Sequence, residues 1–184
     1  MARSDRPTVA SILDKARSFA LDIESRTSLV PLRTPAPPPD EQAQRVAIYD
    51  TLISDGSLRQ ATRRLFRDGY YAQAVGEAYK VVNNTVKKKA NTLDKDGTPM
   101  MMAVFDRAKP ILRLNAMKSV TDGDEQEGYK FIFAGAMLGI RNPRAHQHDL
   151  RDEAATALEM LVMANHLLRV LDGAVKARKK KAGA

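Results

Sequence analysis

The sequence contains no cysteine and no tryptophan, and only 5% of its 184 residues are aromatic. Without cysteine, the chain cannot form disulfides, thiolate zinc sites, iron–sulfur clusters or a cysteine nucleophile. Ala, Leu, Lys and Arg are abundant instead, a balance that favours helix over sheet. A hydrophobic fraction of 43% is enough for a packed core. We therefore expect an all-α protein.

Long uncharged apolar runs are also missing. No such stretch reaches the ~18 residues of a membrane helix, and the charged N-terminal residues lack the apolar core of a signal peptide. These features predict a cytoplasmic protein without a membrane partner. Thirty Lys and Arg against 22 Asp and Glu give a net charge of +8, which suits a polyanionic partner such as RNA.

Proline is concentrated in residues 28–40, where five prolines predict a stiff, extended linker. Before it, apolar residues at helical spacing predict a helical arm over residues 1–27, docked on the body or on a neighbouring subunit. Residues 41–173 show helical periodicity throughout and predict a helical bundle. Residues 174–184 form a predicted basic tail.

Within the predicted bundle, apolar spacing indicates a long helix from about Tyr70 to Asn91 and another apolar helix after Tyr129. The polar and acidic residues 119–127 between them predict a loop. The last helix is expected to run from about Asp149, as its cap, to Asp172.

The chemically suggestive residues lie in one short stretch, Arg141-Asn142-Pro143-Arg144-Ala145-His146. In an unbroken helix, Arg141 and His146 would point about 140° apart. Because Pro143 removes a helix hydrogen bond and disfavours the helical conformation at Asn142, we predict a break, with Asn142 as N-cap and Pro143 as first residue of a new helix. The guanidinium and the imidazole would then converge on an anion near a helix N-terminus.

Such a pair suits metal-free cleavage of RNA. A neutral imidazole can take the proton of a ribose 2′-hydroxyl, and a guanidinium can hold the phosphate oxygens. We expect no cofactor and no metal site, since His146 and His148 would diverge on a helix. The candidate catalytic residues are Arg141, His146 and Asn142, and the possible auxiliary residues are Glu77, Lys80, Arg144 and His148.

Three blocks of sequence, residues 69–80, 97–101 and 135–146, resemble the Ymh group of conserved hypothetical bacterial proteins. The resemblance covers about Leu58 to Gly173. The residues from Arg141 to His146 are also similar to the RxxxxH motif of HEPN domains. This implies a HEPN-like helical bundle that forms a homodimer and brings two motifs into a shared cleft.

The HEPN resemblance further implies an endoribonuclease that leaves a 2′,3′-cyclic phosphate, often in antiviral defence by abortive infection or in toxin–antitoxin systems. Arg141 and His146 would take the catalytic roles by position in the motif, and Asn142 an orienting role. A possible antitoxin or regulatory protein is implied as a partner. The Tyr that follows the His in one toxin branch is absent, because Gln147 and His148 stand there.

Three alternatives remain open from the residues alone. The same cleft could belong to a non-catalytic HEPN-like module that binds RNA, a nucleotide or a protein. The Arg-Asn-Pro sequence could be a structural turn, with Glu77 in an ordinary salt bridge. The N-terminal arm could serve assembly with a neighbouring subunit, alongside either function.

Overall fold

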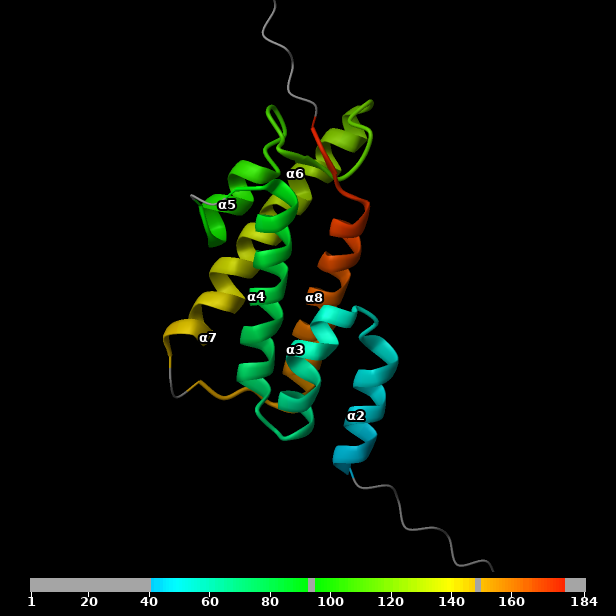
Figure 1. The fold of residues 1–184 in the computed structure, drawn as a ribbon, viewed down its shortest axis with the longest axis vertical. Helices are drawn as coiled ribbons and strands as arrows, with labels where there is room; N and C mark the ends of the chain where they lie inside the picture. Colours follow the sequence, from blue (N-terminus) through cyan, green and yellow to red (C-terminus); the bar gives the residue numbers. More distant parts are fainter. Residues whose placement is uncertain (1–40, 93–94, 148–149, 178–184) are drawn as a thin grey trace, which may run out of the picture. The chain divides into compact units, whose positions relative to one another are not determined.

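The computed structural model describes residues 41–92, 95–147 and 150–177 (Figure 1). The predicted arm, the proline linker and His148 lie outside these residues. The helices are α2 (Glu41–Leu52), α3 (Gly56–Arg67), α4 (Tyr71–Ala90), α5 (Gly97–Val104), α6 (Val120–Gly135), the π-helical turn η1 (Ala136–Arg141), α7 (Asn142–His146) and α8 (Ala154–Gly173). The predicted all-α bundle is thus confirmed for the described part of the chain.

The described residues also include two short strands, β1 (Leu112–Arg113) and β2 (Val175–Lys176). They pair antiparallel, with Leu112 opposite Lys176, and the amide of Ala177 donates to the carbonyl of Ile111 at 2.9 Å. Residues 174–177, which the sequence places in the basic tail, therefore pair with the β1 segment at one end of the bundle.

The helix α4 is the centre of the bundle, packed against α3, α8 and η1 (Figure 1). It matches the predicted helix to within a residue at each end, because small and β-branched residues recur on its inner face. Its buried apolar residues are Ala72, Ala74, Val75, Ala78, Tyr79, Val82, Val86 and Ala90. The helix ends where Asn91 adopts the left-handed conformation, at φ 56°.

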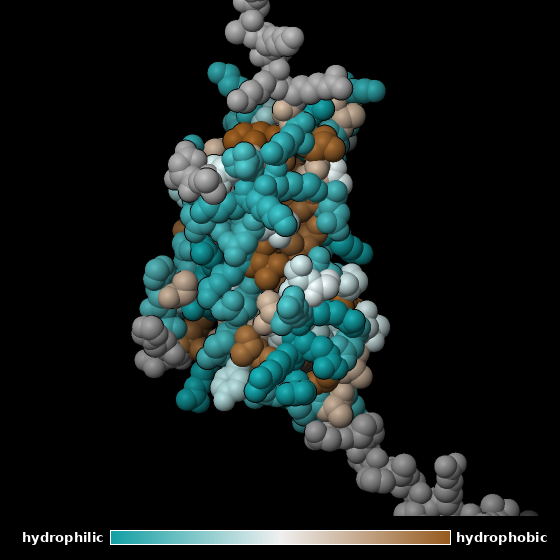
Figure 2. Space-filling view, in the orientation of Figure 1, coloured by the Kyte–Doolittle hydropathy of each residue, from teal (hydrophilic) through white to brown (hydrophobic). Residues whose placement is uncertain are grey.

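The core helix α8 begins at Ala154, so the prediction that it starts at Asp149 was wrong. It is the one described helix long and apolar enough to cross a membrane by length and composition. Seven of its residues are nevertheless buried in the bundle, which is the setting of a core helix in a soluble protein. Figure 2 shows hydrophobic side chains between α4 and α8 and hydrophilic ones over most of the face of α3 and α4.

The helix α6 begins at Val120, so the predicted loop over residues 119–127 was also wrong. Ser119 caps the helix, because its hydroxyl accepts from the amide of Asp122 at 3.0 Å. The Asp122 carboxylate in turn accepts from the Ser119 hydroxyl and from the Lys118 amide, both at 2.8 Å. Reciprocal capping of this kind starts a helix even in a strongly polar sequence.

Candidate functional site

The chain does not leave the helical conformation at Pro143. Arg141 (φ −69°, ψ −49°) and Asn142 (φ −60°, ψ −45°) are both helical, so the predicted break and the N-cap role of Asn142 were wrong. The turn before Pro143 is instead a π-helix, in which the amide of Asn142 bonds to the carbonyl of Met137, five residues back. The wider turn lets the helix continue through Pro143, which has no N–H to donate and whose ring would crowd the preceding turn of a regular α-helix.

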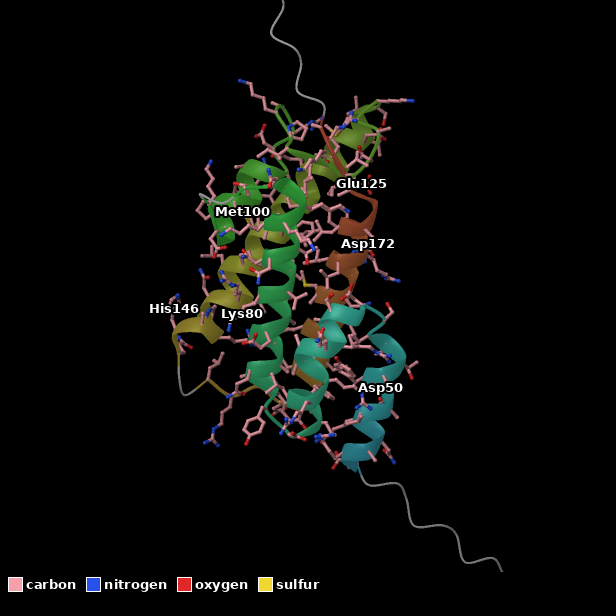
Figure 3. The ribbon with its side chains drawn as sticks, in the orientation of Figure 1. Asp50, Lys80, Met100, Glu125, His146 and Asp172 are labelled. Carbon is pink, nitrogen blue, oxygen red and sulfur yellow. The ribbon has the colours of Figure 1, made fainter. Side chains whose placement is uncertain are left out.

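Because the helix continues, Arg141 and His146 of one chain point to different sides of it, about 140° apart. His146 is exposed, and Figure 3 shows it at the far end of α7. The Arg141 side chain is only 21% exposed and turns toward the body of the bundle. Within the described residues, no hydrogen bond joins the two side chains.

Arg141 lines a small pocket between α4 and the η1–α7 stretch. The volume of this pocket is about 260 Å³. The pocket brings together four of the predicted site residues, Glu77, Lys80, Arg141 and Arg144. It is lined by Gln73, Gly76, Glu77, Lys80, Arg141, Arg144 and Ala145. Lys80 and Glu77 form an ion pair of 2.6 Å on its rim, and both side chains are partly exposed. Figure 3 shows Lys80 on the part of α4 that faces α7.

Asp96 and Asn83, which the sequence did not indicate as site residues, support the Arg141 side chain. Nη2 of Arg141 donates to a carboxylate oxygen of Asp96 at 3.4 Å, and the other oxygen of Asp96 accepts from the buried Asn83 amide at 2.7 Å. The Asn83 side-chain carbonyl accepts from the backbone of Gly97 at 3.0 Å. Gly97 has φ +59°, and a Cβ there would lie 3.6 Å from Nη1 of Arg141.

Asn83 and Asp96 thus anchor the guanidinium through two consecutive hydrogen bonds. Asn83 is buried, whereas the Asp96 side chain is 50% exposed, so the support for Arg141 comes from a carboxylate that is itself held by a buried amide. Nε of Arg141 is buried and has no hydrogen-bond partner among the described residues. No local pattern in the sequence indicates this arrangement, because Asn83, Asp96 and Arg141 come from three separate segments.

Arg144, one of the possible auxiliary residues, forms a buried ion pair. Its guanidinium donates to both oxygens of Asp152, at 2.7 and 2.6 Å, and to the carbonyl of Ile140 at 2.9 Å. The Arg144 and Asp152 side chains are only 6% and 8% exposed. Arg144 therefore lines the pocket with each of its three nitrogens donating one hydrogen bond, and it connects α7 to the segment before α8.

The remaining candidates are less constrained. Asn142 is half-buried and is the first residue of α7, whose N-cap position is taken by Arg141. No group of three His, Cys, Asp or Glu residues in the described part of the chain is arranged to hold a metal ion. His148 lies outside that part.

A family model described as "Protein of unknown function (Hypoth_ymh)" matches residues 54–171. The chain belongs to this Ymh family. The match confirms the Ymh similarity of the sequence over nearly the predicted range and includes Arg141, His146 and every residue of the Arg141 pocket. No curated protein and no solved structure matches the chain.

This Ymh-family chain also carries an exposed apolar strip along α6 and η1. Phe131, Ile132 and Leu138 are 57%, 42% and 61% exposed. Gly128, Gly135 and Gly139 are exposed as well, and a Cβ at each would meet nothing within 4 Å. The strip belongs to the same continuous helical stretch as His146. Contiguous apolar surface of this kind marks sites of protein association.

Proposed function

We propose that the chain is a metal-independent endoribonuclease of HEPN type, with an active site completed by a second copy of the chain. The observation that supports this most directly is the divergence of Arg141 and His146 within one chain. Arg141 is anchored in a pocket by Asp96 and Asn83, whereas His146 is exposed at the end of α7. A histidine placed in this way is available to a site on another molecule.

A two-fold dimer would bring Arg141 of one chain close to His146 of the other. In such a dimer the same surface of each chain meets its counterpart. If the two helical stretches cross antiparallel between Pro143 and Arg144, Arg141 of one chain comes level with His146 of the other, since the two residues are then equally far along the helix from the crossing. The apolar strip of Phe131, Ile132 and Leu138 is on the same stretch and would be covered by that contact.

The chemistry follows from these two side chains. Neutral His146 takes the proton of the ribose 2′-hydroxyl, and the freed oxygen attacks the adjacent phosphorus. The bond between phosphorus and the 5′-oxygen of the next nucleotide breaks, that oxygen takes a proton from water, and His146 returns its proton to solvent, so the products are a 2′,3′-cyclic phosphate and a 5′-hydroxyl. Arg141 stabilises the charge on the non-bridging oxygens. Asn142 orients the reacting groups in this proposal, and the anchored Asp96 keeps Arg141 in place.

The HEPN resemblance of residues 141–146 supports a wider proposal for the cellular setting. We place the enzyme in the cytoplasm, in antiviral defence or a toxin–antitoxin system, with an antitoxin or regulatory protein as a restraining partner. A non-catalytic HEPN-like module is the second candidate. It is favoured by the Arg141 pocket, whose lining includes Lys80, Arg141 and Arg144 but not His146, because a cationic pocket alone is sufficient to bind RNA, a nucleotide or an acidic protein surface.

Cleavage in EDTA separates the two candidates. The purified full chain should cut a single-stranded RNA without metal, and a substrate with one 2′-deoxy position should resist cutting at that position only. His146→Ala should lower the rate on the order of 10²- to 10⁴-fold. Circular dichroism should show unchanged helix content, since His146 is exposed. RNA that binds but stays uncut by the wild-type dimer, with its affinity lowered by Arg141→Ala, would support the binding module and exclude the enzyme.

A further inference from the structure

A groove continues from the Arg141 pocket along the N-terminal half of α4. A second hollow of about 160 Å³ is lined by Ala72, Gln73, Arg144, Gln147 and Leu150. A third, of about 600 Å³, is lined by residues 69–73 and 150–152. Gln73 lines all three hollows, so they adjoin one another along one face of α4.

The groove has positive charge at both ends. Arg141 and Lys80 lie at one end, and Arg151 lies at the other. Arg151 is exposed and forms no ion pair with any residue that the structure describes. Lys80 is paired with Glu77, Arg144 with Asp152 and Arg141 with Asp96, so Arg151 is the one cation of the groove without an ionic partner among the described residues. The pairs of Lys80 and Arg141 are partly exposed, so a phosphate can compete for these two cations. The groove therefore favours a chain that carries negative charge at intervals.

An aromatic side chain stands at the far end of the groove. Tyr70 is 56% exposed, and its ring stacks on no other described aromatic ring. It follows Gly69, whose φ of +83° makes the sharp turn into α4. Tyr70 lies ten residues before Lys80, which corresponds to about 15 Å along the helix. The amides of Gln73 and Gln147 lie between the two ends.

From these features we propose that the groove binds an unpaired stretch of RNA beside the cleaved bond, a subsite that rests on the proposed function. Arg141 and Lys80 hold the reacting phosphate and its neighbour, the amides face base edges, and Tyr70 stacks on a base further along the strand. Arg151 holds a phosphate at that end. Stacking on an aromatic ring requires a base that is free of its partner strand, so duplex RNA does not fit this role.

The test is a binding titration in the full-length His146→Ala background, which prevents cleavage. The probe is a fluorescent uridine oligonucleotide, single-stranded or annealed to its complement, and the readout is anisotropy. Tyr70→Leu should weaken single-strand binding about tenfold, whereas Tyr70→Phe keeps the ring and should bind like the parent. Arg151→Gln should weaken binding and reduce the slope of log K against log salt by about 0.7. Arg169→Gln removes an exposed arginine of α8 outside the groove and should leave that slope unchanged.

The outcomes test the RNA-binding groove and the ribonuclease activity independently. If single-strand binding depends on Tyr70 but the wild-type chain cuts no RNA, the RNA-binding groove stands and the ribonuclease proposal fails. If the wild-type chain cuts RNA and neither Tyr70→Leu nor Arg151→Gln changes KM or affinity, the ribonuclease proposal stands and the groove proposal is overturned. Duplex binding as tight as single-strand binding, or equal competition by poly-glutamate, would also overturn it.

Discussion

Arg144 and Asp152 form a buried ion pair with two parallel hydrogen bonds, from Nε and Nη2 to the two carboxylate oxygens. The third donor group of Arg144 bonds to the carbonyl of Ile140, in the turn where the π-helix runs into Pro143. One side chain thus joins η1, α7 and the segment that leads into α8. The position of Gln147 and Leu150 in the proposed groove depends on this connection.

Loss of one partner of this pair should destabilise the fold. Asp152→Ala leaves the Arg144 guanidinium buried without its counter-ion, so the free energy of unfolding should fall by about 3 kcal/mol. Urea denaturation followed by circular dichroism measures the change. Arg64→Ala is the control, because Arg64 is 86% exposed beside Asp68, and it should leave the midpoint unchanged. Equal midpoints for the two variants would show that Asp152 does not hold this end of the bundle.

The capping of α6 should make stability depend on pH. The Lys118 backbone amide, then the Ser119 hydroxyl, lower the pKa of Asp122 below its usual value. A carboxylate with a lowered pKa in the folded state contributes stability above its unfolded pKa of about 3.9. That contribution is lost as the pH falls through the folded pKa.

We therefore expect Asp122→Asn to lower Tm at pH 7 and to reduce the fall in Tm between pH 5 and about pH 2. Thermal melts at half-unit intervals measure both effects. Ser119→Ala removes both the cap on the Asp122 amide and one hydrogen bond to the carboxylate, so it should lower Tm at every pH and also reduce the fall in Tm at low pH. Parallel Tm curves for Asp122→Asn and wild type would contradict this account of the cap.

The exposed strip on α6 and η1 should mediate dimerisation. Leu138→Lys places a charge on the apolar strip, five residues before Pro143 and the proposed crossing, so we expect a folded monomer with activity reduced at least tenfold. Sedimentation equilibrium gives the mass. Ile48→Lys is a matched control on α2, where the native side chain is 49% exposed, and it should stay dimeric. A Leu138→Lys dimer with full activity would exclude this face.

The sequence predicted the parts of the fold that depend on periodic apolar residues. The helix α4 is an example, because its buried residues recur at helical spacing over five turns. The start of α6 was missed although the signal was present, since Ser119 and Asp122 have the spacing of a capping box. The acidic composition of residues 119–127 is typical of a loop, but the capping hydrogen bonds of Ser119 and Asp122 start a helix there.

Pro143 led the site prediction to the wrong local geometry. A proline in a helical pattern can end the helix or be absorbed by a wider turn, and the local sequence does not distinguish the two outcomes. Asn83, Asp96 and Asp152 could not be identified because their partners are distant in sequence. The residues of the RxxxxH match were found, whereas the partners that hold Arg141 and Arg144 required the fold.

The composite site is tested most directly by mixing two inactive variants. Arg141→Ala and His146→Ala should each be inactive alone in EDTA. After the two are mixed and allowed to exchange subunits, half of the dimers carry one intact pair, Arg141 from one chain and His146 from the other. RNA cleavage should then return to about a quarter of the wild-type rate. A mixture that exchanges subunits fully, as followed by mass spectrometry, yet stays inactive would contradict a site shared between two chains.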